Sequence, residues 1–103
     1  MPNVQQPQPG QQQGQQIQIK LPDDVGKGVH ANLMSVMHTK EEFIIDFILV
    51  NPAQRQGMVN ARVVTSPGHA KRIAKALEEN VKKYESTHGT IAEAQAPEVG
   101  FTA

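Results

Sequence analysis

The most constraining feature of this sequence is the run FIIDFILV at residues 43–50, in which every side chain except Asp46 is apolar. A strand with two apolar faces is covered on both sides when the chain folds. We therefore predict that residues 43–50 form the central strand of a sheet.

Three other segments alternate apolar and polar residues, which is the period of a half-buried strand. They cover residues 17–21, 29–38 and 58–65, and turn-forming Pro and Gly residues separate them. Consecutive strands joined by short turns pair in antiparallel fashion. The pattern predicts a four-stranded antiparallel β-meander.

A long helix follows the last strand. Ser66 and Pro67 are a typical helix start, since the serine side chain caps free amides and proline is suited to the first turn. Apolar residues then recur at steps of three and four up to Tyr84, which predicts a helix over residues 67–87. We expect its apolar stripe to pack on the sheet face that carries Phe43, giving an α+β fold.

The opposite face of this predicted sheet has no second helix to cover it. It would expose an apolar surface made up of Met34, Val36, Ile44, Ile48, Val50, Met58 and Val64. Contiguous apolar surface of that extent usually marks an interface, so we expect a homodimer that forms through this face. Two alternatives are that the tails fold over the face, or that the register is wrong by one residue.

Both ends of the chain differ in composition from this domain. Residues 1–16 are almost all Gln, Pro and Gly, which predicts a disordered tail, and residues 90–103 are expected to form a flexible tail. The folded domain then covers residues 17–89. No cysteine is present, and no leader or membrane-spanning run is recognisable, so we expect a cytoplasmic protein without disulfides.

The residues indicate no catalytic or metal chemistry. There is no phosphate-binding loop and no nucleophile elbow, and Asp23 and Asp24 lack the further ligands of a calcium loop. His30 and His38 on one strand would lie about 27 Å apart, and His69 and His88 on one helix about 28 Å apart, so neither pair can share an ion within one chain; pairings between elements or between subunits stay open. We expect no cofactor, no metal and no enzymatic activity.

The single acidic residue of the central strand has two interpretations. In the simplest hairpin registers, Met37 pairs with Phe43 and Asp46 falls opposite Arg62. A buried carboxylate is tolerated when it is paired, so we favour a structural charge pair over a catalytic acid.

Basic residues are the best candidates for a binding site. His69, Lys71, Arg72 and Lys75 lie near the helix start, and Arg55 lies in the preceding hairpin loop. Glutamates alternate with basic residues along the rest of the helix, so a merely solvated helix face is the alternative. The formal net charge is zero, which does not by itself indicate nucleic-acid binding.

Several short motifs resemble a known family. They include MHTKEEF at residues 37–43, ARVVTSP at residues 61–67 and HAKR at residues 69–72. Over about residues 17–91 the chain resembles a widespread prokaryotic family of small proteins classed as a domain of unknown function. The resemblance implies no activity, although some members are encoded beside the large RNA polymerase subunits. It also picks out Asp46, Arg62, Ser66, Pro67, His69, Lys71 and Arg72.

From these observations we expect a non-enzymatic homodimeric binding or accessory protein, associated with the transcription machinery through a protein partner such as RNA polymerase. The alternative is direct binding of single-stranded nucleic acid, because four strands and one helix also form the plan of several single-strand-binding transcription cofactors. That alternative lacks exposed aromatic residues for base stacking, since Phe43, Phe47 and Tyr84 are predicted on the core side. No membrane association is expected.

Overall fold

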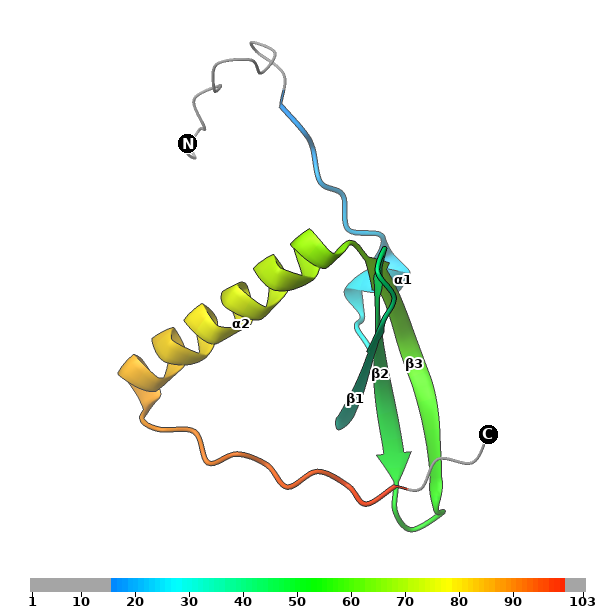
Figure 1. The fold of residues 1–103 in the computed structure, drawn as a ribbon. Helices are drawn as coiled ribbons and strands as arrows, with labels where there is room; N and C mark the ends of the chain where they lie inside the picture. The colour runs from blue at the N-terminus through cyan, green and yellow to red at the C-terminus, as the bar shows by residue number, and fades with distance from the viewer. Residues whose placement is uncertain (1–15, 100–103) are drawn as a thin grey trace.

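The computed structural model describes residues 16–99, which form an α+β fold (Figure 1). A three-stranded antiparallel sheet with strand order β1-β2-β3 is followed by a C-terminal helix. The elements are α1 (Asp23–Gly26), β1 (Leu33–His38), β2 (Phe43–Asn51), β3 (Gln56–Thr65) and α2 (Pro67–His88). The predicted N-terminal tail lies outside the described residues except for Gln16, and residues 90–99 form neither helix nor strand.

The predicted central strand is β2, which lies between β1 and β3. Three of its apolar side chains, those of Ile45, Ile48 and Val50, are at most 9% exposed, and Asp46 is 5% exposed. The described residues contain no other buried hydrophobic side chain. The core of a single copy is therefore very small.

The expected first strand at residues 17–21 is wrong. Ile17 and Ile19 are 91% and 93% exposed, so the alternation in this segment buries neither face. Alternation stabilises a strand only when a neighbouring strand supplies backbone partners and a core covers one side. The segment instead leads through Pro22 into the single turn of α1.

The expected strand at residues 29–38 is shortened to β1 by two asparagine side chains. The side-chain amide of Asn32 replaces the backbone hydrogen bonds that a longer β1 would make to Val50 on β2. Its Oδ1 accepts from the Val50 N–H at 2.8 Å, and its Nδ2 donates to the Val50 carbonyl at 3.0 Å. Asn60 on β3 donates through Nδ2 to the His30 carbonyl at 2.9 Å. Because β2 lies between β1 and β3, the chain before β1 must cross one face of β2 to reach Asn60.

The register of the first hairpin differs from the prediction by one residue. His38 pairs with Phe43, and Met37 pairs with Ile44 rather than with Phe43. A hydrogen-bonded turn accounts for this register, since the Thr39 N–H donates to the Glu42 carbonyl at 2.9 Å and closes a loop one residue shorter than expected. A shift of one residue reverses the faces of a strand. The side chains of β1 therefore lie on the opposite faces from those predicted.

The second hairpin follows the prediction only in its first half. Asp46 pairs with Arg62 and Phe47 with Ala61, but Ile48 pairs with Val59. Asn60 is thus an extra residue in β3 and forms a β-bulge. Beyond the bulge the register is displaced by one residue, so the exposed apolar face expected from the sequence is not assembled as predicted.

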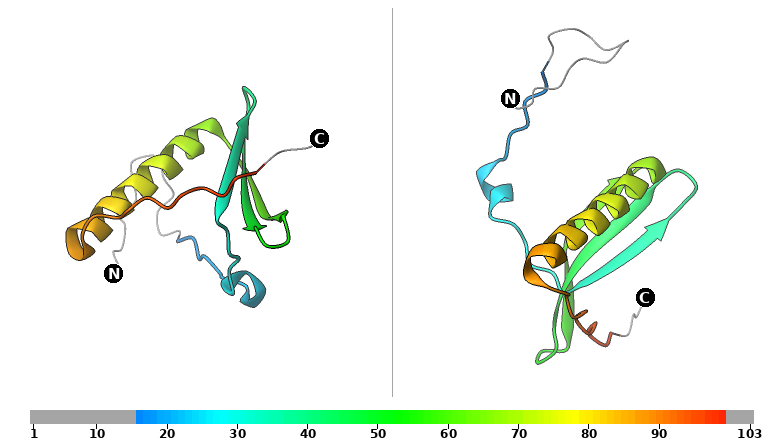
Figure 2. Two further views of the ribbon diagram at one scale, coloured as in Figure 1. Left: turned by 90° about the horizontal axis from the view of Figure 1, so that it is seen from below. Right: turned by 90° about the vertical axis from the view of Figure 1, so that its left-hand side faces the viewer.

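The helix α2 begins at Pro67 as predicted, but it does not cover the sheet. No residue of α2 is buried. Figure 1 and the left view of Figure 2 show α2 leaving the end of β3 and running away from the sheet at an angle. Only Ser66 separates β3 from α2, and Pro67 restricts the backbone at the first helical position. The expected close packing of α2 on the Phe43 face is therefore wrong for a single copy.

Candidate functional site

The most buried polar group in the described residues is the carboxylate of Asp46 on β2. Arg62 on β3 holds it with two parallel hydrogen bonds, in which Nε donates to Oδ1 at 2.7 Å and Nη2 donates to Oδ2 at 2.8 Å. The hydrogen bonds from Arg62 hold the pKa of Asp46 below its ordinary value of 3.8, although desolvation opposes this shift. The side chain of Arg62 is 56% exposed, so one end of the pair faces solvent.

The geometry of this pair suits a structural role. A carboxylate that two guanidinium hydrogen bonds keep ionised is poorly suited to deliver or exchange a proton near neutral pH. The pair crosses two neighbouring strands in register, which satisfies both charges and fixes the pairing of β2 with β3.

The start of α2 is built by a side-chain cap. Ser66 Oγ accepts from the His69 N–H at 3.1 Å, and the Ser66 carbonyl accepts from the Ala70 N–H at 2.9 Å. Pro67 occupies the first helical position, where its missing N–H leaves no unpaired donor. The backbone of His69 thus belongs to the cap, which fixes where the following basic residues emerge.

Three of the candidate binding residues gather on one face of α2. At about 100° per residue, Lys71, Arg72 and Lys75 lie about 120° to 160° around the helix from Leu77. All three are exposed, and none forms an ion pair within residues 16–99. The first turn of α2 carries no acidic residue. We call these three residues the basic cluster; they form a compact positive surface near the helix start.

The other two candidates are not part of this cluster. His69 lies about 80° from Leu77 and so borders the apolar stripe. Arg55 lies in the hairpin between β2 and β3, at the opposite end of β3 from α2. The ten residues of β3 at about 3.3 Å each separate Arg55 from the helix start by about 33 Å. The structure therefore does not bring Arg55 together with the basic cluster.

The apolar stripe of α2 lies opposite the basic cluster and remains largely exposed. Leu77 is 61% exposed, Tyr84 52% and Val81 44%. Ala70 and Ile73, nearer to the sheet, are half-buried. A helix with an apolar stripe normally buries it against another element. The stripe of α2 lacks such a covering within residues 16–99.

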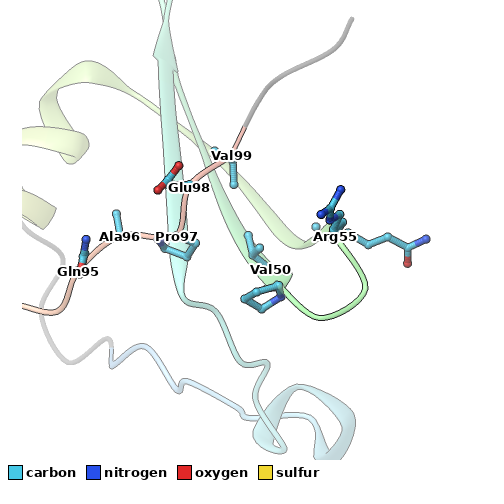
Figure 3. Close-up of a pocket in the computed structure, with 10 residues that line it drawn as sticks. Val50, Arg55, Gln95, Ala96, Pro97, Glu98 and Val99 are labelled. Atoms are coloured by element: carbon cyan, nitrogen blue, oxygen red, sulfur yellow. The ribbon is translucent and has the colours of Figure 1, made fainter.

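A pocket of about 690 Å³ lies at the end of the sheet that is remote from the start of α2 (Figure 3). It forms where residues 95–99 lie against the hairpin between β2 and β3. Its lining includes Val50, Arg55, Pro97 and Glu98. The sequence did not predict this site, because nothing in the composition of the C-terminal segment indicates that it returns to the hairpin. Its lining is mixed and has no convergent set of polar groups.

Two classes of site find no support among the described residues. No group of three or more His, Cys, Asp or Glu side chains within residues 16–99 is placed to hold a metal ion. No helix in the described part of the chain has the length and apolarity that crossing a membrane requires.

A comparison with models of protein families identifies the family of this chain. The model of the DUF3467 family, described as a protein of unknown function, matches residues 1–93. The chain belongs to the DUF3467 family. The resemblance seen over residues 17–91 is thus confirmed, and the DUF3467 match also includes the Gln-rich N-terminal segment. No curated protein and no solved structure matches the chain.

Membership of the DUF3467 family brings no activity with it, because the family description assigns none. The features that indicate a function therefore lie on α2. This helix carries the basic cluster on one side and an uncovered apolar stripe on the other.

Proposed function

We propose that this chain is a non-enzymatic homodimeric accessory protein that binds an acidic surface of another protein through the basic cluster of α2. The observation that carries this proposal is the grouping of Lys71, Arg72 and Lys75, all exposed and none engaged in an ion pair within residues 16–99. Cations that are neither buried nor paired add little to the stability of a fold, and they are available to a partner of opposite charge.

The small core supports the homodimer. A domain of about 70 residues buries only about 60% of the surface of its unfolded chain, so its stability is marginal even when its core is well packed. Here only Ile45, Ile48 and Val50 are buried hydrophobic residues within the described part of the chain. Chains of this size without disulfides or metals often complete their core by association. A second copy would supply the missing apolar contacts.

We propose the transcription machinery, and RNA polymerase in particular, as the first partner to test. This choice rests on the resemblance to proteins encoded beside the polymerase subunits. The positive charge of the basic cluster supports a protein partner, because it is complementary to a carboxylate-rich surface.

Direct binding of single-stranded nucleic acid is the second candidate, because phosphates would suit the same basic cluster. Single-strand binders generally add aromatic side chains on which bases stack. Tyr84 is 52% exposed but lies on the apolar stripe, on the other side of α2 from Arg72 and Lys75. The protein partner is therefore favoured.

Binding to purified components separates these two candidates. Labelled protein is titrated with core RNA polymerase from the same organism and, separately, with a single-stranded oligonucleotide at about 50 and 200 mM salt. Arg72→Glu/Lys75→Glu reverses the charge of the basic cluster. Lys82→Glu/Lys83→Glu is the matched control, because it makes the same charge change about 15 Å further along α2.

The expected result is that the polymerase binds the wild type and the Lys82/Lys83 control, whereas the Arg72/Lys75 variant binds at least tenfold more weakly. Oligonucleotide binding that falls steeply and log-linearly with salt, and that the Arg72/Lys75 variant loses, would support the second candidate instead. Equal loss in both variants would show general charge attraction and would refute a local site. If the wild type binds neither component, both candidates fail.

A further inference from the structure

The apolar stripe of α2 is symmetric about its central residue. Ile73 and Val81 lie four residues before and after Leu77, and Ala70 and Tyr84 lie seven residues before and after it. At 100° per residue, all five side chains fall within about 40° of one line along the helix. Reversing the direction of the helix therefore leaves the positions of these five residues unchanged.

This symmetry is what a two-fold interface requires. Around a two-fold axis the same patch serves both copies, so that residue i of one copy contacts residue j of the other and the reverse also holds. We infer that α2 packs antiparallel against α2 of a second copy, with Leu77 of both copies at the two-fold axis. This inference rests on the proposed homodimer and names its interface.

The side chains are complementary in this arrangement. The small Ala70 lies opposite the large Tyr84 at each end of the pair, and Ile73 lies opposite Val81. Alternation of large and small residues across facing positions lets two helices interdigitate. Leu77 and Tyr84, more than half exposed in a single copy, become buried in the pair.

The flanking charges agree with the antiparallel direction. Lys71 and Glu85 lie on the same flank of the stripe, at about 120° and 80° from Leu77. In the antiparallel pair, Lys71 of each copy lies close to Glu85 of the other, so opposite charges meet twice. Lys71 then belongs to the dimer interface, and Arg72 and Lys75 of the basic cluster remain available to the partner protein. A parallel pair would instead place the two Lys71 side chains on opposite sides of the helix pair, with Glu85 of the other copy about 21 Å away along the axis, so these opposite charges would not meet.

The connection to the sheet explains why a second copy, rather than the chain's own sheet, covers the stripe. The single residue Ser66 between β3 and α2 fixes the direction in which the helix leaves the sheet. At its other end, the Ile91 N–H donates to Glu85 Oε2 at 2.8 Å, which ties the following segment to α2. Within one copy, α2 diverges from the sheet between these two restraints, as Figure 1 shows.

The chain offers a direct test because it contains no cysteine. Helices in contact lie about 8–10 Å apart, and their Cα atoms lie about 2.3 Å from each axis, so facing Cα atoms approach to about 3.5–5.5 Å. A disulfide spans about 4.4–6.8 Å between Cα atoms. Leu77→Cys should therefore link two copies under mild oxidation, and Lys75→Cys on the outer side of α2 is the matched control.

Two more variants report the direction of the helices. In the antiparallel pair, Ile73 of one copy lies about 12 Å along the axis from Ile73 of the other, which is too far for a disulfide. Ile73→Cys alone should thus stay unlinked, whereas a mixture of Ile73→Cys and Val81→Cys should give the mixed dimer. Sedimentation equilibrium of the reduced full-length wild type measures the oligomeric state independently.

The inference predicts a dimer of the wild type, efficient linkage through Leu77→Cys, linkage in the mixture, and none through Lys75→Cys. A dimer that Leu77→Cys does not link would overturn this interface and leave the proposed homodimer standing. Linkage of Ile73→Cys to itself would overturn the antiparallel direction. A monomeric wild type at about 100 μM would overturn both the interface and the homodimer, since a stable dimer with a Kd near 1 μM is fully formed at that concentration.

Discussion

Truncating Leu77 tests whether this side chain stabilises mainly a single copy or the contact between two copies. Because Leu77 is 61% exposed, a single copy gains only about two-fifths of the free energy that full burial of this side chain would contribute. Full burial of a leucine contributes about 2 kcal/mol, so Leu77→Ala should cost one isolated copy less than about 1 kcal/mol. The better helix propensity of alanine reduces this cost further.

The cost is larger in the antiparallel pair. A buried Leu→Ala change costs about 2–5 kcal/mol. About three-fifths of that cost is assigned to the interface, and each dimer contains two copies of Leu77. The dimerisation free energy should then weaken by about 2.5–6 kcal/mol, which raises the dissociation constant by about a hundredfold or more.

Sedimentation equilibrium over a range of concentrations measures this change directly. Met58→Ala is a suitable control, because Met58 is 69% exposed but lies on β3 rather than on α2. The control should change the dissociation constant less than threefold, and circular dichroism should show that both variants keep their helix. If Leu77→Ala folds and dimerises as tightly as the wild type, then Leu77 does not lie in the interface.

Three further predictions concern the fold. Asp46→Asn should lower Tm at pH 7, and this difference should shrink as the pH falls below the ordinary carboxyl pKa of 3.8, when circular dichroism follows unfolding against pH. The hydrogen bonds from Arg62 hold the pKa of Asp46 below 3.8, so the stabilisation is fully present above that value and is lost as the pH falls through the lower pKa of the folded state. Ser66→Ala should cost about 1 kcal/mol in urea unfolding through loss of the helix cap, whereas Ser66→Asp should retain most of it. Arg55→Gly should leave stability unchanged or raise it by up to about 1 kcal/mol in the same assay, because Arg55 has a φ of 51°, where glycine is unstrained.

Local chemistry made part of this fold predictable. The apolar run that became β2 marks the central strand whatever its partners are, and the dipeptide Ser66-Pro67 marks a helix start because it satisfies the first free amides. Both features depend on residues close together in the sequence. The pairing of Asp46 with Arg62 was also predicted, but it holds only because the extra residue Asn60 compensates for a one-residue shift in the register of the hairpin loop.

Features that depend on distant side chains were not predictable in the same way. The bulge at Asn60 shifts the register of half of β3, and the Asn60 side chain donates a hydrogen bond to the carbonyl of His30, thirty residues earlier in the sequence. The alternation at residues 17–21 is typical of a strand, yet this segment pairs with no other strand of the described residues. In the candidate site, the spacing of Lys71, Arg72 and Lys75 along the helix placed them together. The distance to Arg55 depended on the length of β3.

The geometry of α2 also has a consequence for how a dimer would bind its partner. Arg72 and Lys75 lie about 140° and 160° around the helix from Leu77. If Leu77 lies at the two-fold axis, the basic clusters of the two copies face away from each other, on opposite sides of the helix pair. One flat partner surface could then contact only one cluster at a time. The dimer would gain no avidity from a single such surface, but it could join two partner molecules. A stoichiometry of two partner molecules per dimer is therefore expected in sedimentation velocity, and a single partner bound by both clusters would contradict the antiparallel arrangement.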